Sequence, residues 1–315
     1  MFIQKVLCAI FSLTLLLGSC SSEKTCLEKP HLGGCILTSP AAEAPRDLYQ
    51  ESNIVTTDEY KPFTKKLSVY GITLIARDDI SDPFMRKIAK TVKEMFPRGG
   101  AIDDALQEDV LRNLYRYRVA IPLFKGEAGF DSEEEWTTYG NMKLRNSVCD
   151  IIMEGEPGRQ VMEVVEHILH HVTDVGLHYT FPDEWGISKS SKLYQAMREA
   201  IDKDYYDASS YEDIDDEARE RVMLQEFAYL LITTAWDLQE PYGGGADEWT
   251  RGGKVGNSAD LKAKLPRSYQ LFEQTIPKVM VSPSKSTLDG FIKAPTRALP
   301  LSLNHPRSYC SSSVR

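Results

Sequence analysis

The sequence predicts an α+β domain, with a small mixed sheet in its N-terminal half and a mostly helical C-terminal half. Two observations predict this class. Segments rich in β-branched residues alternate with amphipathic segments between residues 67 and 153, and helical periodicity dominates after residue 158. Of the 315 residues, 42% are hydrophobic, which is enough apolar side chain for a large domain to bury a sizeable core.

The N-terminal half contains three expected strands and two expected helices. The strands are residues 67–76 (LSVYGITLIA), 118–124 (RVAIPLF) and 147–153 (SVCDIIM), and the helices are residues 84–96 and 103–115. Asp82 and Pro83 supply an N-cap and a first-turn proline for the first helix. Pro122 lacks a backbone N–H, so we expect its strand at an edge of the sheet.

The C-terminal half is expected to be helical. The expected helices are residues 159–175, 192–203, 215–238 and 261–277, the last with a break at Pro266. Gly176 is expected to end the first of these helices, and residues 241–253 are expected to form a flexible glycine-rich loop.

The N-terminus has the pattern of an export signal. Lys5 is followed by an apolar run over residues 6–17, which has the length of a signal-peptide core and is too short to cross a bilayer as a helix. The run ends in LGSC, which resembles the lipobox of bacterial lipoproteins. The resemblance implies cleavage before Cys20, acylation of its thiol, and anchorage to a membrane on the periplasmic or cell-surface side. An ordinary secretory signal is the alternative, and either route removes residues 1–19.

The remaining chain is expected to divide into three parts. Residues 20–66 are rich in Ser, Pro, Glu and Thr without sustained periodicity, which predicts a flexible tether. Residues 67–281 form the globular domain, and the Ser- and Pro-rich residues 282–315 are expected to be a disordered tail.

Charge and cysteine content restrict the partners. The net charge is −9 and the sequence has no basic patch to neutralise phosphates, so nucleic acid is not an expected partner. The cysteines other than Cys20 are too few for a disulfide scaffold. Cys26 and Cys35 are close enough in sequence to pair in an oxidising compartment, a question that the sequence leaves open.

Histidines and carboxylates gather on one face of the helix expected over residues 159–175. At about 100° per residue, six polar groups share an arc of roughly 140°. They are Glu163, Glu166, His167, His170, His171 and Asp174. A solvated surface face is the simpler interpretation, but such faces usually carry Lys and Arg, and none occurs between Gln160 and Asp174. We therefore favour a metal site, because histidines at i and i+4 point the same way and can converge on one zinc ion.

A tetrahedral zinc site needs a further protein ligand, and Glu226 is the candidate. Glu226 is a lone carboxylate in the segment QEFAY, just before an apolar stretch. A carboxylate on a buried helix is costly unless it is paired or bound to a cation. The alternative is an exposed glutamate on the last polar turn of its helix.

These segments together resemble the zincin metallopeptidases of the gluzincin kind. In that pattern one helix carries HExxH and a later helix carries a glutamate in an E-[FYW]-x-A context. His167 and His171 occupy the two histidine positions, and Glu226 occupies the third-ligand position. The resemblance implies a zincin-like α+β fold over about residues 67–240, with zinc held by these three side chains, and hydrolysis of a peptide or protein substrate.

One departure from the family pattern matters for activity. The family's general base directly follows the first histidine, and that position here is Ile168. Three explanations stay open. Glu166 or His170 substitutes as the catalytic group, or the motif has the inverted spacing with Glu163 and His167 as ligands, or hydrolysis has been lost. Asp174 is expected either to orient a ligand histidine as an outer carboxylate or to be solvated.

The sequence thus supports a leading hypothesis and two alternatives. The leading hypothesis is an exported, membrane-anchored zinc peptidase with Glu166 as the preferred base. The second is a catalytically inactive zincin-fold lipoprotein that acts as a scaffold or binding module, which Ile168 favours. The third is a periplasmic protein that stores or senses metal, which predicts easily exchanged metal with no dependence on Glu226.

Overall fold

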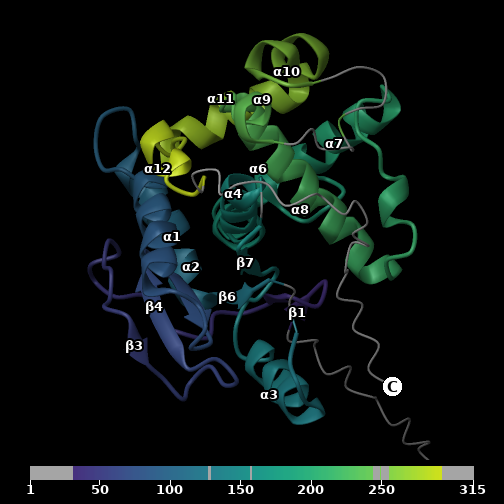
Figure 1. Cartoon of the computed structure of the whole chain (residues 1–315). Coiled ribbons are helices and arrows are strands. Elements are labelled where there is room, and N and C mark those ends of the chain that lie inside the picture. The colour runs from purple at the N-terminus through teal and green to yellow at the C-terminus, as the bar shows by residue number, and fades with distance from the viewer. Residues whose placement is uncertain (1–30, 127–128, 157, 244–248, 250–254, 293–315) are drawn as a thin grey trace, which may run out of the picture.

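The computed structural model describes residues 31–126, 129–156, 158–243, 249 and 255–292. Within them a five-stranded mixed sheet lies below a helical layer (Figure 1), so the predicted α+β class is confirmed. Across the sheet the strands are β3 (Val55–Thr56), β4 (Lys65–Val69), β5 (Ile72–Ala76), β6 (Val119–Lys125) and β7 (Ile152–Glu154). The first three are antiparallel, and β5, β6 and β7 are parallel. A separate hairpin pairs β1 (His31–Leu32) with β2 (Ile36–Leu37).

Helices make up most of the chain after β7. The helices of the N-terminal half are α1 (Asp82–Met95), α2 (Asp104–Arg116) and α3 (Glu133–Lys143). Those that follow are α4 (Gln160–His171), α5 (His178–Thr180), α6 (Pro182–Trp185), α7 (Lys192–Asp202), α8 (Asp216–Ala235), α9 (Gln239–Tyr242), α10 (Ser258–Lys264), α11 (Pro266–Val279) and α12 (Lys285–Asp289). None of the helices in the described ranges is long and apolar enough to span a membrane.

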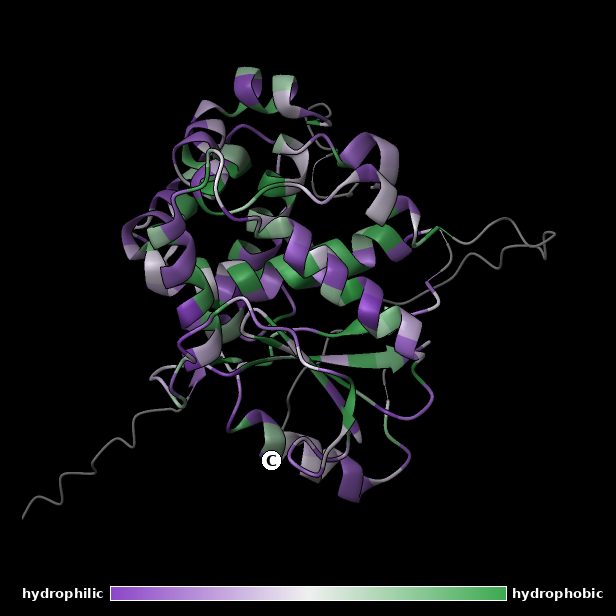
Figure 2. Ribbon diagram, turned by 90° about the vertical axis from the view of Figure 1, so that its left-hand side faces the viewer, coloured by the Kyte–Doolittle hydropathy of each residue, from purple (hydrophilic) through white to green (hydrophobic). Residues whose placement is uncertain are grey.

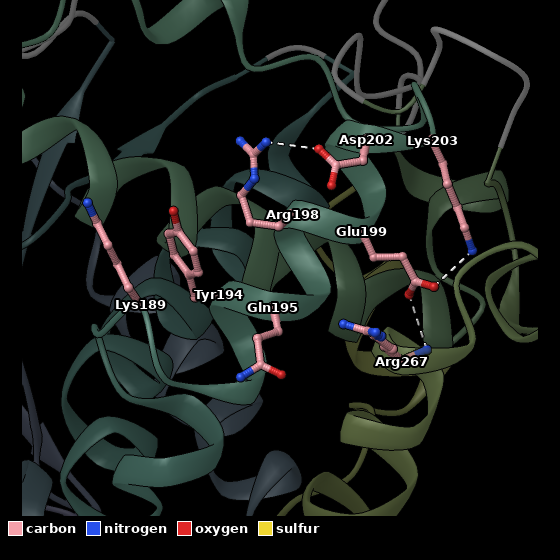
Figure 3. A pocket seen from close by; sticks show the side chains of 8 residues that line it. All are labelled: Lys189, Tyr194, Gln195, Arg198, Glu199, Asp202, Lys203 and Arg267. Carbon is pink, nitrogen blue, oxygen red and sulfur yellow. Dashed lines mark hydrogen bonds and ion pairs between the residues drawn. The ribbon is translucent and has the colours of Figure 1, made fainter.

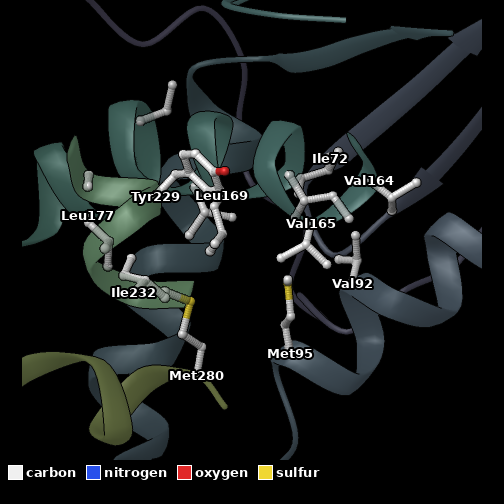
Figure 4. Close-up of a cluster of buried hydrophobic side chains, with 14 of the residues drawn as sticks. Ile72, Val92, Met95, Val164, Val165, Leu169, Leu177, Tyr229, Ile232 and Met280 are labelled. Atoms are coloured by element: carbon white, nitrogen blue, oxygen red, sulfur yellow. The ribbon is translucent and has the colours of Figure 1, made fainter. Parts of the chain in front are cut away.

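Helix α4 lies at the centre of the molecule, between the sheet and the upper helices (Figure 1). Its apolar side packs against α1 and β5 in one direction and against α8 in the other (Figure 4). Val164, Val165 and Leu169 are fully buried there. Burial of each such side chain stabilises the fold by about 1.5–3 kcal/mol. Figure 2 shows the same distribution, with hydrophobic segments in the central helices and the sheet and more hydrophilic residues on the outer helices. Because its apolar side is packed in the core, the polar side of α4 is fixed in position.

The strand expected over residues 67–76 is a hairpin of two strands, β4 and β5. Tyr70 and Gly71 form the turn, both with positive φ (50° and 89°). Gly71 is required there, because a Cβ atom on it would lie 2.8 Å from Cβ of Leu114 and 2.9 Å from the carbonyl oxygen of Leu111.

Pro122 does not mark an edge strand, which corrects the sequence-based expectation. Strand β6 is interior and pairs with both β5 and β7. The N–H of Ala120 donates to the carbonyl oxygen of Ser147, which precedes β7. The nitrogen of Pro122, two residues further along β6, therefore faces the same side of the strand. Strand β7 pairs with β6 only from Leu123 onward, so Pro122 lies where no ladder bond is needed.

Gly176 does not end the helix that begins at Gln160. The chain continues from α4 into a π-helical segment (Val172–Leu177) and then into α5. A Cβ atom at Gly176 would lie 2.9 Å from Cγ1 of Val110 on α2. The glycine therefore allows close approach of two helices.

The expected tether over residues 20–66 is wrong for residues 31–66, which are part of the fold. Ile36 and Phe63 are fully buried, and a disulfide joins Cys35 to Cys149. The N-terminal part of the expected tail also belongs to the fold, because Leu288 of α12 is buried. The expected signal peptide, the acylated Cys20, residues 20–30, the tail beyond residue 292 and most of the glycine-rich loop lie outside the described residues.

Candidate metal centre

The polar side of α4 faces α8 and the segment that precedes β7. Residues 148–151 have no regular secondary structure, since β7 begins at Ile152. This segment brings Asp150 to the α4 histidines. From the other side, α8 brings Glu226 to His170. Three elements that are distant in sequence therefore meet at one cluster of titratable side chains.

His170 is the most enclosed member of this cluster, with no exposed surface. Its Nδ1 lies 2.8 Å from Oδ2 of Asp150, in hydrogen-bond contact. Its Nε2 is buried and has no hydrogen-bond partner, and the nearest acid is Oε2 of Glu226 at 3.7 Å. A buried ring nitrogen without a partner is costly, and one that faces carboxylates is placed to bind a cation.

His167 lies one turn earlier on α4 and is 9% exposed. Its Nδ1 makes an ion-pair contact of 3.3 Å with Oε1 of Glu163, which also accepts a 2.7 Å hydrogen bond from the N–H of Met153. Its Nε2 lies 3.7 Å from Oδ2 of Asp150 and 4.0 Å from Oε1 of Glu166. The two histidine rings are 5.5 Å apart between centroids.

The ligand atoms form two groups, each with all its atoms within 4.8 Å of one another. One group is Asp150, His167 and His170, and the other is Glu166, His170 and Glu226. The structure therefore has buried His, Asp and Glu side chains that could bind a metal ion. Imidazole and carboxylate ligands together suit zinc and other divalent transition metals.

Burial perturbs the pKa values of the two glutamates in the second group. It raises the pKa of Glu226 to about 8, although the neighbouring His170 acts in the opposite direction. It also raises the pKa of Glu166. Burial therefore disfavours the charged form of both glutamates, and for Glu226 this holds at neutral pH unless a cation joins it.

Asp150 and the two histidines show the complementary perturbation. Burial would raise the pKa of Asp150, but His167 and His170 hold it well below its usual range. Burial alone would lower the pKa values of both histidines. Asp150 and Glu163 raise the pKa of His167, and Glu226 and Asp150 raise that of His170. The cluster thus favours positive charge between its carboxylates.

His171, an expected zinc ligand, is not brought into either group. Its ring is fully buried, Nδ1 bonds the carbonyl oxygen of His167 at 2.7 Å, and Nε2 accepts the N–H of Cys149 at 3.2 Å. Burial lowers the pKa of His171 to about 4, so the ring is neutral. Both nitrogens are used by the backbone, and the histidine pair in the cluster is His167 and His170 instead.

Asp174 lies apart from the histidines and pairs with Arg221 on α8. Nη1 of Arg221 donates to Oδ2 of Asp174 at 2.9 Å, and both side chains are buried. Arg221 also donates to Gln225, whose Nε2 donates to Oδ2 of Asp150 at 3.3 Å. The outer carboxylate that orients a ring in this site is therefore Asp150, and Asp174 acts on it only through two other side chains.

Asp150 belongs to the cluster but is not among the candidate residues that the sequence indicates. It lies in SVCDIIM, whose pattern predicts an ordinary strand. An acidic residue inside an apolar run of a buried strand is itself a signal, because a carboxylate there needs a partner.

A separate surface hollow lies on α7 and the start of α11 (Figure 3). Its charged side chains pair locally: Arg198 with Asp202 at 2.9 Å, and Lys203 with Glu199 at 2.8 Å. The residues that line the hollow offer no concentration of one charge and no buried titratable group.

Comparison with known proteins gives no match: no protein-family model, no curated protein and no solved structure is significantly similar to this chain.

Proposed function

We propose that this protein is an exported zinc-dependent hydrolase that acts on peptide bonds, with its metal at Glu166, His170 and Glu226. The observation that carries the proposal is the ring of His170. Its Nδ1 is fixed by Asp150, and its buried Nε2 has no hydrogen-bond partner and faces Glu226. A ligand histidine in metalloproteins is usually held in this way, by an outer carboxylate on the nitrogen that does not bind the metal.

Each residue has a distinct role in this proposal. Asp150 holds the tautomer and the ring orientation of His170, and Glu226 and Glu166 supply the anionic ligands. Glu166 is also the candidate general base that the sequence favours. Zinc with three protein ligands and an open position lowers the pKa of a coordinated water and polarises a carbonyl group.

The peptide substrate, the zincin-like fold and the exported, membrane-anchored location rest on the sequence. The support is the resemblance of residues 167–171 and 225–229 to the gluzincin pattern, and of LGSC to a lipobox. The proposed ligand set differs from that pattern, because Glu166 and His170 take the places of His167 and His171.

Metal analysis of the purified full-length chain tests the proposal. We expect bound zinc in the wild type and loss of at least one equivalent per chain in His170→Ala. His178→Asn is the matched control, because His178 lies on the same helical run, accepts a hydrogen bond from Ile187, and belongs to neither ligand group. Absence of bound zinc in the wild type would overturn the proposal.

A peptide-digestion assay then tests the reaction. Cleavage of a mixed peptide library should stop with a chelator, return with zinc, and be lost in Glu166→Gln. Zinc binding without cleavage would favour the second candidate, an inactive metal-binding scaffold. The observation in favour of that candidate is Ile168, which replaces the family's base and is fully buried in the core, away from the ligands.

A further inference from the structure

The two ligand groups are not alternative descriptions of one site. His167 belongs to one group and Glu226 to the other, and His170 takes part in both through different ring nitrogens. Nδ1 of His170 faces Asp150 and Nε2 faces Glu226, so these two acids approach opposite edges of one ring. One ion bound at Nε2 of His170 would leave the carboxylates around Nε2 of His167 without a cation.

The surroundings of the two histidines follow the same plan. Each ring has a carboxylate at Nδ1, which is Glu163 for His167 at 3.3 Å and Asp150 for His170 at 2.8 Å. Each Nε2 points to further carboxylates, at 3.7 and 4.0 Å for His167 and at 3.7 Å for His170. An outer carboxylate on one nitrogen and acids at the other is the usual environment of a metal-binding histidine. It is complete at His170, whereas at His167 the Nδ1 contact with Glu163 is an ion-pair contact without a hydrogen bond.

The distances suit an ion at each Nε2. Metal–ligand bonds of about 2.0–2.2 Å place neighbouring ligands of a tetrahedral zinc site roughly 3.3 Å apart. The separations from Nε2 to the nearest acids exceed this by a few tenths of an ångström, which small side-chain rotations can remove. Glu166 can serve both positions, because it lies 4.0 Å from Nε2 of His167 and belongs to the group of His170.

The charge of the cluster is also compatible with two divalent ions. Four carboxylates surround the two imidazoles: Asp150, Glu163, Glu166 and Glu226. Arg221 is already paired with Asp174 and so compensates that acid instead. With neutral histidines, one divalent ion leaves two negative charges uncompensated in a largely buried space, whereas two ions neutralise the four carboxylates.

We propose that the cluster binds two divalent metal ions, one at Nε2 of His170 with Glu226 and one at Nε2 of His167 with Asp150, with Glu166 between them. This inference rests on the proposed function, because it takes the His170 position as a metal site. It adds that the metal centre holds two ions. Paired metal ions are typical of hydrolases that stabilise both the attacking and the leaving group.

Zinc stoichiometry of the full-length chain tests the inference without any assay of activity. The protein is stripped with a chelator, dialysed against zinc, and analysed for zinc per chain. We expect two equivalents in the wild type and in the control His178→Asn, and one equivalent in His167→Gln and in Glu226→Gln. Circular dichroism of each variant confirms that it is folded. The number of zinc ions per wild-type chain tests the inference even if a variant does not fold.

The outcomes separate this inference from the proposed function. One equivalent in the wild type would overturn the two-metal inference. The single-metal proposal would then stand if that equivalent is lost in Glu226→Gln, and it would fall as well if Glu226→Gln retains it. No zinc in the wild type would overturn both. Titration with cobalt(II), followed by its visible absorbance, gives a second measure: a break at two equivalents supports the inference, and a break at one refutes it.

Discussion

Removal of the Cys35–Cys149 disulfide should destabilise the protein and weaken the proposed metal site together. The bond joins residues 114 positions apart and ties the β1–β2 hairpin to the segment that carries Asp150. In the chain-entropy model, a closed loop of this length is worth about 5 kcal/mol of unfolding free energy.

The expected loss in the Cys35→Ser, Cys149→Ser variant is therefore about 3–5 kcal/mol. The lower value allows for contacts that keep the hairpin in place without the bond. The N–H of Val148 still donates to the carbonyl oxygen of Cys35 at 3.1 Å, and Leu37 donates to Oγ of Ser147 at 3.1 Å.

Urea unfolding of the metal-free protein measures this loss, and zinc competition with a chromophoric chelator measures the effect on the site. Because Cys149 directly precedes Asp150, we expect zinc affinity to fall by roughly 10–100-fold, as for loss of an outer carboxylate. Cys26→Ser is the control, and it should change neither value. A loss below about 1 kcal/mol with unchanged zinc affinity would refute the reasoning, and an effect of Cys26→Ser equal to that of Cys149→Ser would refute the pairing.

Three further predictions concern buried groups outside the ligand set. Arg221→Met should cost about 3–5 kcal/mol in urea unfolding, because it leaves the buried Asp174 unpaired, and adding Asp174→Asn should restore most of this loss. Gly176→Val should cost about 1–3 kcal/mol in the same assay, since its side chain would collide with Val110; an unchanged midpoint would contradict the packing argument. His178 has a pKa lowered by burial to about 4, below its usual 6.5. The unfolded chain therefore binds a proton that the folded chain resists, so stability is full above pH 6.5 and falls as pH decreases toward 4. Between pH 7 and 5 the wild type should lose about 1–2 kcal/mol more than His178→Asn, and equal pH profiles would count against it.

The sequence predicted those elements whose apolar periodicity is strong. Helices α1, α2 and α7 lie within one to two residues of their expected bounds, because each buries a single continuous face. Helix α3 was missed, since its apolar residues are spread around the helix and it is stabilised by contacts such as Phe130 with Tyr139. The sequence also did not predict that residues 31–66 are folded onto the domain. Their folding depends on partners far along the chain, such as Cys149 and Ser147, that no local pattern reveals.

The helical wheel placed Glu166, His167 and His170 on one face, and the structure brings that face to Asp150 and Glu226, but the wheel could not select between neighbouring histidines. His170 and His171 are adjacent in sequence and both fully buried, yet one faces Asp150 and Glu226 while the other is held by the backbone. The difference is set by the N–H of Cys149, which lies 22 residues away and takes the free nitrogen of His171. A spacing of four residues shows only that two side chains share a helix face. Which of them is left with an unpartnered nitrogen depends on the segment packed against that face, and here that segment also supplies the acid that orients His170.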